Sequence, residues 1–354
     1  MALPTPACPT DKPNRLYMVE FLRIGLMLLI FFLHVMNQYP EDGKKALAFL
    51  FGSAKHHIGL CVECFFIIGG FFLYKRLTSD VSPFEQIKRT WLRLAPGLLF
   101  AFLLCVCLCK VRLVHLPTIL TLAVGTGQAA PFTHVLKCGD WFVGVYFWVS
   151  CLLLGIFQLP KRMAFLALGA LMYAAFSMYL NHPKWVQDLV ISPLVGITNA
   201  GMIRGVYSMG LGVIMGFLAQ HIALPQRWWA KLLGTAFEVW CLATVFIFIA
   251  RPHHCHQSYW EVLATMALLL LSISQSWGYL SQLLNKCARI QYVSRYVFPA
   301  LMGHMVMMRL LDTYHQFNLD FTKGLILVIG GSITLGVMEY HLVERYLLRK
   351  IRGN

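Results

Sequence analysis

Apolar segments of helix length alternate with short polar ones along almost the whole chain. A helix needs about 20 apolar residues to cross the hydrocarbon core of a bilayer, and we count about ten such segments. They cover residues 17–38, 57–75, 92–109, 140–158, 163–181, 203–220, 231–250, 258–277, 291–311 and 323–344. The residues between them leave no room for a separate soluble domain. The pattern therefore predicts an all-α fold, a polytopic membrane helical bundle of about ten transmembrane helices.

The composition agrees with a lipid environment. Of the 354 residues, 58% are hydrophobic and 13% are charged, whereas about 25% of a soluble domain is charged. The formal net charge of +15 would favour nucleic acid as a partner of a soluble chain, but no basic soluble module accompanies it. We therefore expect membrane lipids, and no nucleic acid, as partners.

Lysine and arginine are concentrated in loops on one side of the predicted bundle. Two dense examples are YKRLTSDVSPFEQIKRTWLR, residues 74–93, and ERYLLRKIRGN, residues 344–354. Such loops stay on the cytoplasmic side of a membrane, and an even number of spans places both ends of the chain on that side. The pattern predicts a cytoplasmic leader over residues 1–15 and a basic cytoplasmic tail over residues 345–354.

Two ionisable residues, an arginine and a histidine, stand in the otherwise apolar run RIGLMLLIFFLHV, residues 23–35 of the first apolar segment. A charge at mid-bilayer costs about 3 kcal/mol on insertion scales, so such residues persist mainly where a partner, water or a ligand compensates them. Arg23 and His34 are eleven residues apart, or about 16 Å and about three helical turns, so both lie on one helix face. Structural hydrogen bonds between helices are the alternative interpretation for each.

Glu63 lies in the second apolar segment, and the antiparallel course of the first two spans places it at a depth similar to that of His34. A carboxylate beside an imidazole favours its charged form and can orient its tautomer. The two residues are therefore candidates for a general base and its helper. Arg23 either stabilises developing negative charge or pairs with Glu20 at rest.

A basic cluster precedes the third apolar segment. Lys88, Arg89 and Arg93 lie near the predicted inner surface, with the two arginines one helical turn apart. Guanidinium groups in such an arrangement bind phosphates well. The alternative is a loop that sets topology and whose side chains extend to lipid headgroups.

Motifs for other chemistries are absent or weak. The sequence contains no G-x-S-x-G, Walker A or H-E-x-x-H motif. The stretch HHCH at residues 253–256 offers imidazole and thiolate groups, but adjacent residues rarely supply a tetrahedral zinc site alone. We expect no metal site.

Together these residues resemble the membrane acyltransferase 3 family, bacterial integral-membrane O-acyltransferases of surface polysaccharides, over nearly the whole chain. That family opens with an acidic residue three positions before an arginine, and a histidine eleven further on, which Glu20, Arg23 and His34 match. It also has an acidic or polar position before F-F-x-x-S-G-F, a basic run ending in R-x-x-P, a tryptophan motif, a ninth-span histidine and a closing V-E-R-P. The second-span motif resembles Glu63, Phe65, Phe66, Gly70 and Phe71, and the basic run resembles Lys88, Arg89, Arg93 and Pro96. The tryptophan motif resembles Trp141 and Phe142, the ninth-span histidine resembles His304, and the closing motif resembles the stretch with Glu344.

The chain departs from the family pattern at several positions. Gly69 stands where serine is usual, and Thr90 interrupts the arginine run. Gly139 and Asp140 replace the histidine that often precedes the tryptophan, and Tyr346 replaces the closing proline. These departures raise the alternative of an inactive scaffold within the same family.

The resemblance implies a single integral-membrane acyltransferase domain, residues 1–354, in the inner (plasma) membrane of the cell. It implies transfer of an acyl group, commonly acetyl, from cytoplasmic acyl-CoA to a hydroxyl of a cell-surface glycan or lipid-linked sugar. Acyl-CoA is then the donor substrate, and no cofactor is bound permanently. On this interpretation His34, Glu63 and Arg23 are catalytic and the basic cluster binds CoA phosphates, whereas direct transfer and a covalent relay both stay open.

Two rival functions fit part of the pattern. A permease or flippase for a lipid-linked sugar would use Arg23, His34 and Glu63 as an anion or proton-coupled site. A membrane acyltransferase of the unrelated histidine-bearing O-acyltransferase type is the second rival, although the compact length and the early arginine–histidine pair argue against it.

Overall fold

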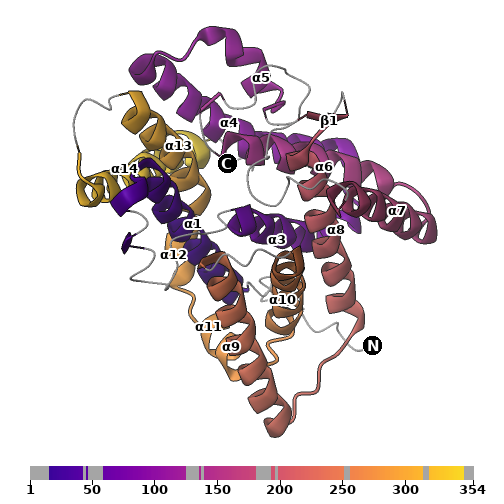
Figure 1. Ribbon diagram of the computed structural model, residues 1–354. Coiled ribbons are helices and arrows are strands. Elements are labelled where there is room, and N and C mark those ends of the chain that lie inside the picture. Colours follow the sequence, from indigo (N-terminus) through magenta and orange to yellow (C-terminus); the bar gives the residue numbers. More distant parts are fainter. Residues whose placement is uncertain are drawn as a thin grey trace, which may run out of the picture.

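The computed structural model describes residues 16–42, 45–46, 59–124, 135–136, 139–180, 193–195, 198–250, 256–313 and 319–346. Helices make up nearly all of this part of the chain (Figure 1). The long ones are α1 (Tyr17–Gln38), α3 (Gly59–Leu77), α4 (Pro83–Cys109), α6 (Asp140–Ile156), α7 (Lys161–Leu180), α8 (Ala200–His221), α9 (Trp228–Ala250), α10 (His256–Ser274), α13 (Val297–Thr313) and α14 (Phe321–Glu339).

Shorter elements connect the long helices. They are a 3₁₀ turn (Leu113–His115), α5 (Leu116–Leu120), α11 (Tyr279–Asn285), α12 (Ile290–Ser294) and a π-helix (Tyr340–Glu344) that continues α14. Two short antiparallel strands, β1 (Pro193–Val195) and β2 (Thr198–Asn199), precede α8.

Nine of the ten predicted apolar ranges each overlap one long helix, and the range 291–311 covers both α12 and α13. Five helices in the described residues are long and apolar enough to cross a membrane, or six if the bent pair α10 and α11 forms one span. The prediction of an all-α membrane protein is confirmed, whereas ten crossings stay a prediction. One predicted range is broken, because 291–311 divides into α12 and α13. Helix α10 also bends by 65° into α11, which lies just beyond the predicted range 258–277.

Helix α3 occupies the middle of the bundle, where it contacts α1, α6, α8 and α10 (Figure 1). Its closest partner is α8, because glycines face the partner backbone on both helices. A Cβ atom at Gly70 would overlap the carbonyl oxygen of Met209, and one at Gly212 would overlap that of Ile67. Small residues allow such backbone approach in membranes, where packing rather than water drives helix association.

A buried carboxylate fixes the bend between α10 and α11. Glu238 of α9 is fully buried and accepts hydrogen bonds from the Ser272 hydroxyl (2.8 Å) and from the N–H groups of Gly278 (3.1 Å) and Ser281 (3.0 Å). The last residue of α11, Asn285, in turn accepts a 3.0 Å hydrogen bond from the N–H of Met18. The bend therefore holds the first turn of α1 in place.

The tight α3–α8 contact predicts different effects for two glycine substitutions. Gly70→Ala should lower the free energy of unfolding by about 1–3 kcal/mol, because the added methyl group forces the two backbones apart. Gly169→Ala is the matched control, since nothing lies within 4 Å of a Cβ at that helical position. Thermal unfolding of both variants in detergent measures the difference, and equal melting temperatures would contradict the packing argument.

Candidate functional site

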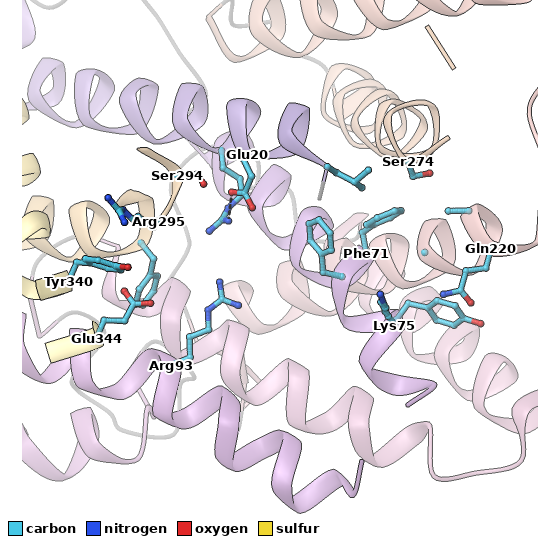
Figure 2. Close-up of a pocket in the computed structure, with 17 residues that line it drawn as sticks. Glu20, Phe71, Lys75, Arg93, Gln220, Ser274, Ser294, Arg295, Tyr340 and Glu344 are labelled. Atoms are coloured by element: carbon cyan, nitrogen blue, oxygen red, sulfur yellow. Dashed lines mark hydrogen bonds and ion pairs between the residues drawn. The ribbon is translucent and has the colours of Figure 1, made fainter. Parts of the chain in front are cut away.

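A cavity of about 650 Å³ opens at one end of the bundle. It is lined by the first turns of α1, the last turns of α3 and α8, the first half of α4, the α12–α13 junction and the π-helix. Its charged lining residues are Glu20, Arg23, Lys75, Arg93, Arg295 and Glu344 (Figure 2). These helix ends are the ones that the basic loops predict to be cytoplasmic.

Arg23 pairs with the carboxylate one turn before it. Its Nη1 lies 2.8 Å from Oε2 of Glu20, which is one of the two alternatives that the sequence left open for Arg23. Arg93 points from α4 toward this pair (Figure 2) and makes no hydrogen bond or ion pair with any residue that the structure describes. In the cavity lining, Arg23 is thus neutralised by Glu20, whereas Arg93 is able to bind an anion.

The structure divides the basic cluster that the sequence suggested. Arg93 lines the cavity, but Lys88 and Arg89 lie outside it, with side chains 58% and 57% exposed. Both bind Glu85 on their own helix, with N–O distances of 3.7 Å for Lys88 and 3.0 Å for Arg89. Of the three, Arg93 is therefore the one placed to meet a ligand in this cavity.

His34 lies three turns along α1 from the cavity and is half-buried. Its Nδ1 is 3.0 Å from the carbonyl oxygen of Ile30. Because a carbonyl only accepts, this contact places a proton on Nδ1, and the lone pair of the neutral ring is then on Nε2. The sequence could not fix this tautomer.

A second histidine lies beside the first. The ring centroid of His304 in α13 is 4.8 Å from that of His34 and 4.7 Å from that of Phe31, on which it stacks. His304 is fully buried, and neither nitrogen has a hydrogen-bond partner in the described parts of the chain. The structure therefore brings together two predicted candidates that are 270 residues apart in sequence (304 minus 34).

Glu63 is fully buried between α3 and α8. Nε of Arg204 lies 2.5 Å from one of its oxygens and Nη2 lies 2.7 Å from the other. The Tyr207 hydroxyl is 3.4 Å from the first oxygen, and Trp141 lies under the guanidinium at 5.4 Å. That Glu63 orients His34 stays a prediction, since the structure gives Glu63 this bidentate partner.

Sequence reasoning missed Arg204. A second arginine within an apolar segment was the available signal, because such a charge needs a partner in lipid. The candidate Trp141 has a clear contact, since it packs on Arg204 and on Phe66.

Three departures from the family pattern have structural reasons. A Cβ at Gly69 would overlap the ring of Tyr146, so glycine leaves room for that ring. Thr90 is buried and accepts a 2.6 Å hydrogen bond from Nη2 of Arg76. Asp140 is also buried, and one of its oxygens accepts the N–H groups of Val135 (2.7 Å) and Leu136 (2.8 Å).

The described residues contain no group of three or more His, Cys, Asp or Glu side chains that could bind a metal ion. Residues 253–255 of the HHCH stretch lie outside the described part of the chain.

The buried ion pair predicts a strong double-mutant coupling. Glu63→Leu or Arg204→Met alone should cost about 3–5 kcal/mol of stability, because each leaves one buried charge without its partner. The double variant should lose clearly less than the sum of the two. Equilibrium unfolding in mixed micelles provides the four values, and additive losses would show that the pair is not coupled.

A family model matches most of the chain. The family model of acyltransferase 3, described as an acyltransferase domain, matches residues 16–337. A search of curated proteins finds no matching sequence. The matched range contains α1 to α13 and nearly all of α14, and so includes His34, Glu63, Arg93, Arg204 and His304.

Proposed function

The chain belongs to the acyltransferase 3 family and is a membrane acyltransferase, and from this premise we propose both of its substrates. The donor is a cytoplasmic acyl-CoA, with acetyl as the acyl group. The acceptor is a hydroxyl of a cell-surface glycan or lipid-linked sugar. On this proposal the protein spans the inner (plasma) membrane with both termini in the cytoplasm.

One observation supports the donor assignment: helix α1 carries both Arg23, which lines the cavity, and His34, whose Nδ1 lies near a backbone carbonyl. Arg23 and Arg93 line the cavity, and His34 follows Arg23 by about 16 Å along α1. An acyl-CoA has the same layout, because its phosphates are joined to the reactive thioester by a long, thin pantetheine arm. The phosphates would lie in the cavity while the thioester reaches His34.

The separation assigns different roles to Arg23 and His34. Arg23 lies about 16 Å from His34 along the helix. When the thioester carbonyl is next to His34, it is therefore too far from Arg23 for a hydrogen bond. We therefore assign Arg23 to donor binding, in exchange for its bond to Glu20, rather than to stabilisation of the oxyanion.

His34 carries the proton in the proposed transfer. Its Nε2 removes the proton of the acceptor hydroxyl as the oxygen attacks the thioester carbonyl. The C–O bond forms, the C–S bond breaks, and the same proton passes from His34 to the CoA sulfur. The Ile30 carbonyl, 3.0 Å from Nδ1, holds the ring in the tautomer that this direct route requires.

The role of His34 predicts a selective loss of turnover. His34→Ala should lower kcat for acetyl transfer by about 10²- to 10⁴-fold, because positioned base catalysis contributes that much, while membrane insertion persists. His221→Ala is a matched control, since Nδ1 of this exposed histidine also lies near a backbone carbonyl one turn back, at 2.7 Å. Release of CoA by purified protein measures turnover, and near-normal activity of His34→Ala would exclude it as the base.

The acceptor is tested in cells. Mass spectrometry of surface glycans from cells with the normal chain should show an acyl group that is missing in cells with His34→Ala. Identical glycans would exclude a surface glycan as the acceptor.

The cavity predicts that two neighbouring arginines differ in donor binding. Arg93→Gln should weaken acetyl-CoA binding by about 10- to 100-fold, which corresponds to loss of a charge-assisted hydrogen bond. Arg89→Gln should change the affinity by less than about threefold, because Arg89 is outside the cavity and its exposed bond to Glu85 is worth little. Isothermal titration of the purified variants measures both affinities. Absence of acetyl-CoA binding to the unmodified protein would exclude this donor and favour the permease alternative.

A further inference from the structure

One end of the cavity gathers an arginine and several aromatic rings. Arg295 lies between α12 and α13, with its guanidinium carbon 4.9 Å from the ring centroid of Tyr296 and 5.4 Å from that of Tyr340. Its Nε donates a 3.1 Å hydrogen bond to the carbonyl of Tyr292. Its terminal nitrogens make no hydrogen bond to any residue that the structure describes. Arg295 is therefore held in place and keeps donors for an anion.

A carboxylate with no donor lies at the same end. Glu344 lines the cavity, and its Oε2 is buried without a hydrogen-bond partner among the described residues. It ends the π-helix Tyr340–Glu344, an element found frequently at functional sites. A carboxylate is only an acceptor when ionised, and a buried acceptor left unpaired is costly. The site therefore calls for a ligand that brings an N–H or O–H group.

The opposite end of the cavity has a different chemistry. Lys75, Gln220 and Phe71 lie there (Figure 2), and they provide a cation, an amide and a ring. The other carboxylate in the cavity lining, Glu20, is already bound to Arg23 at 2.8 Å. Arg295, Tyr340 and Glu344 thus combine a cation, an aromatic face and an available acceptor at one end (Figure 2).

We propose that this end binds the 3′-phosphoadenosine part of the acyl-CoA donor, an inference that rests on the proposed function. That group offers the three complementary features together: a phosphate, a purine ring and an exocyclic amino group. Arg295 binds the 3′-phosphate, Tyr340 stacks on the adenine, and Glu344 accepts a hydrogen bond from the amino group. Arg23 and Arg93, which line the same cavity, bind the diphosphate, and the pantetheine arm follows α1 toward His34.

The 3′-phosphate contact is tested by comparing two ligands, with and without the 3′-phosphate, on the unmodified protein and on two variants. Titration of the purified protein with CoA and with 3′-dephospho-CoA should show about 10- to 100-fold tighter binding of CoA. Arg295→Gln should bind the two ligands within about twofold of each other. Lys75→Gln, the control at the opposite end, should keep the preference for CoA. Both side chains are exposed, so neither substitution removes a core contact.

Other results of that titration overturn the assignment. A preference that survives in Arg295→Gln and disappears in Lys75→Gln would place the 3′-phosphate at the opposite end. Equal binding of both ligands to the unmodified protein would exclude a 3′-phosphate site. Either result leaves the proposed acyl-CoA donor intact, whereas failure of CoA and acetyl-CoA to bind at all would overturn the proposed function and this inference together.

The adenine contact has its own test. A CoA analogue with unsubstituted purine in place of adenine lacks the amino group, and the unmodified protein should bind it about tenfold more weakly than CoA. Glu344→Leu should bind the two ligands equally, because it has no acceptor for the amino group. An unchanged preference in Glu344→Leu, or none in the unmodified protein, would exclude Glu344 as the partner of adenine.

Discussion

The cost of a charge inside the membrane is the constraint on which the rest of the structure depends. Each buried ionised group needs a partner of opposite charge, a set of hydrogen bonds, or a ligand. Glu63 meets Arg204 through both oxygens, and Glu238 accepts two backbone N–H groups and a hydroxyl. These contacts join α3 to α8 and α9 to the α10–α11 bend, so neutralising the charges also fixes the relative positions of the helices.

The charged groups without such partners lie mainly at the cavity. Arg93 and the terminal nitrogens of Arg295 have no acceptor in the described residues, and Oε2 of Glu344 has no donor there. The bend held by Glu238 also supports this site, because Asn285 at the end of α11 anchors the N–H of Met18 one turn before Arg23. Structural pairing elsewhere in the bundle thus positions the groups that remain for a ligand.

The positions that depart from the family pattern fit local packing, whereas the positions that keep it include those used in the proposed chemistry. Gly69 leaves room for Tyr146 and Thr90 accepts a hydrogen bond from Arg76, so both replacements fit local packing. Neither residue lines the cavity. The positions that the proposed chemistry uses, His34, Arg23 and Arg93, keep the residue types of the family pattern. The departures therefore do not by themselves argue for an inactive protein.

The sequence by itself determined the membrane bundle, most of the helical ranges and the placement of Glu20 one turn before Arg23, because hydrophobic length and helical spacing are local properties. Only the tertiary structure paired Glu63 with Arg204 and His34 with His304, and separated Arg93 from Lys88 and Arg89. It also brought Arg295 and Glu344 to one end of the same cavity. Each of these depends on the relative rotation and depth of helices far apart in the chain. The spacing within one helix determines which residues share a face, but the packing of neighbouring helices determines which side chains that face contacts.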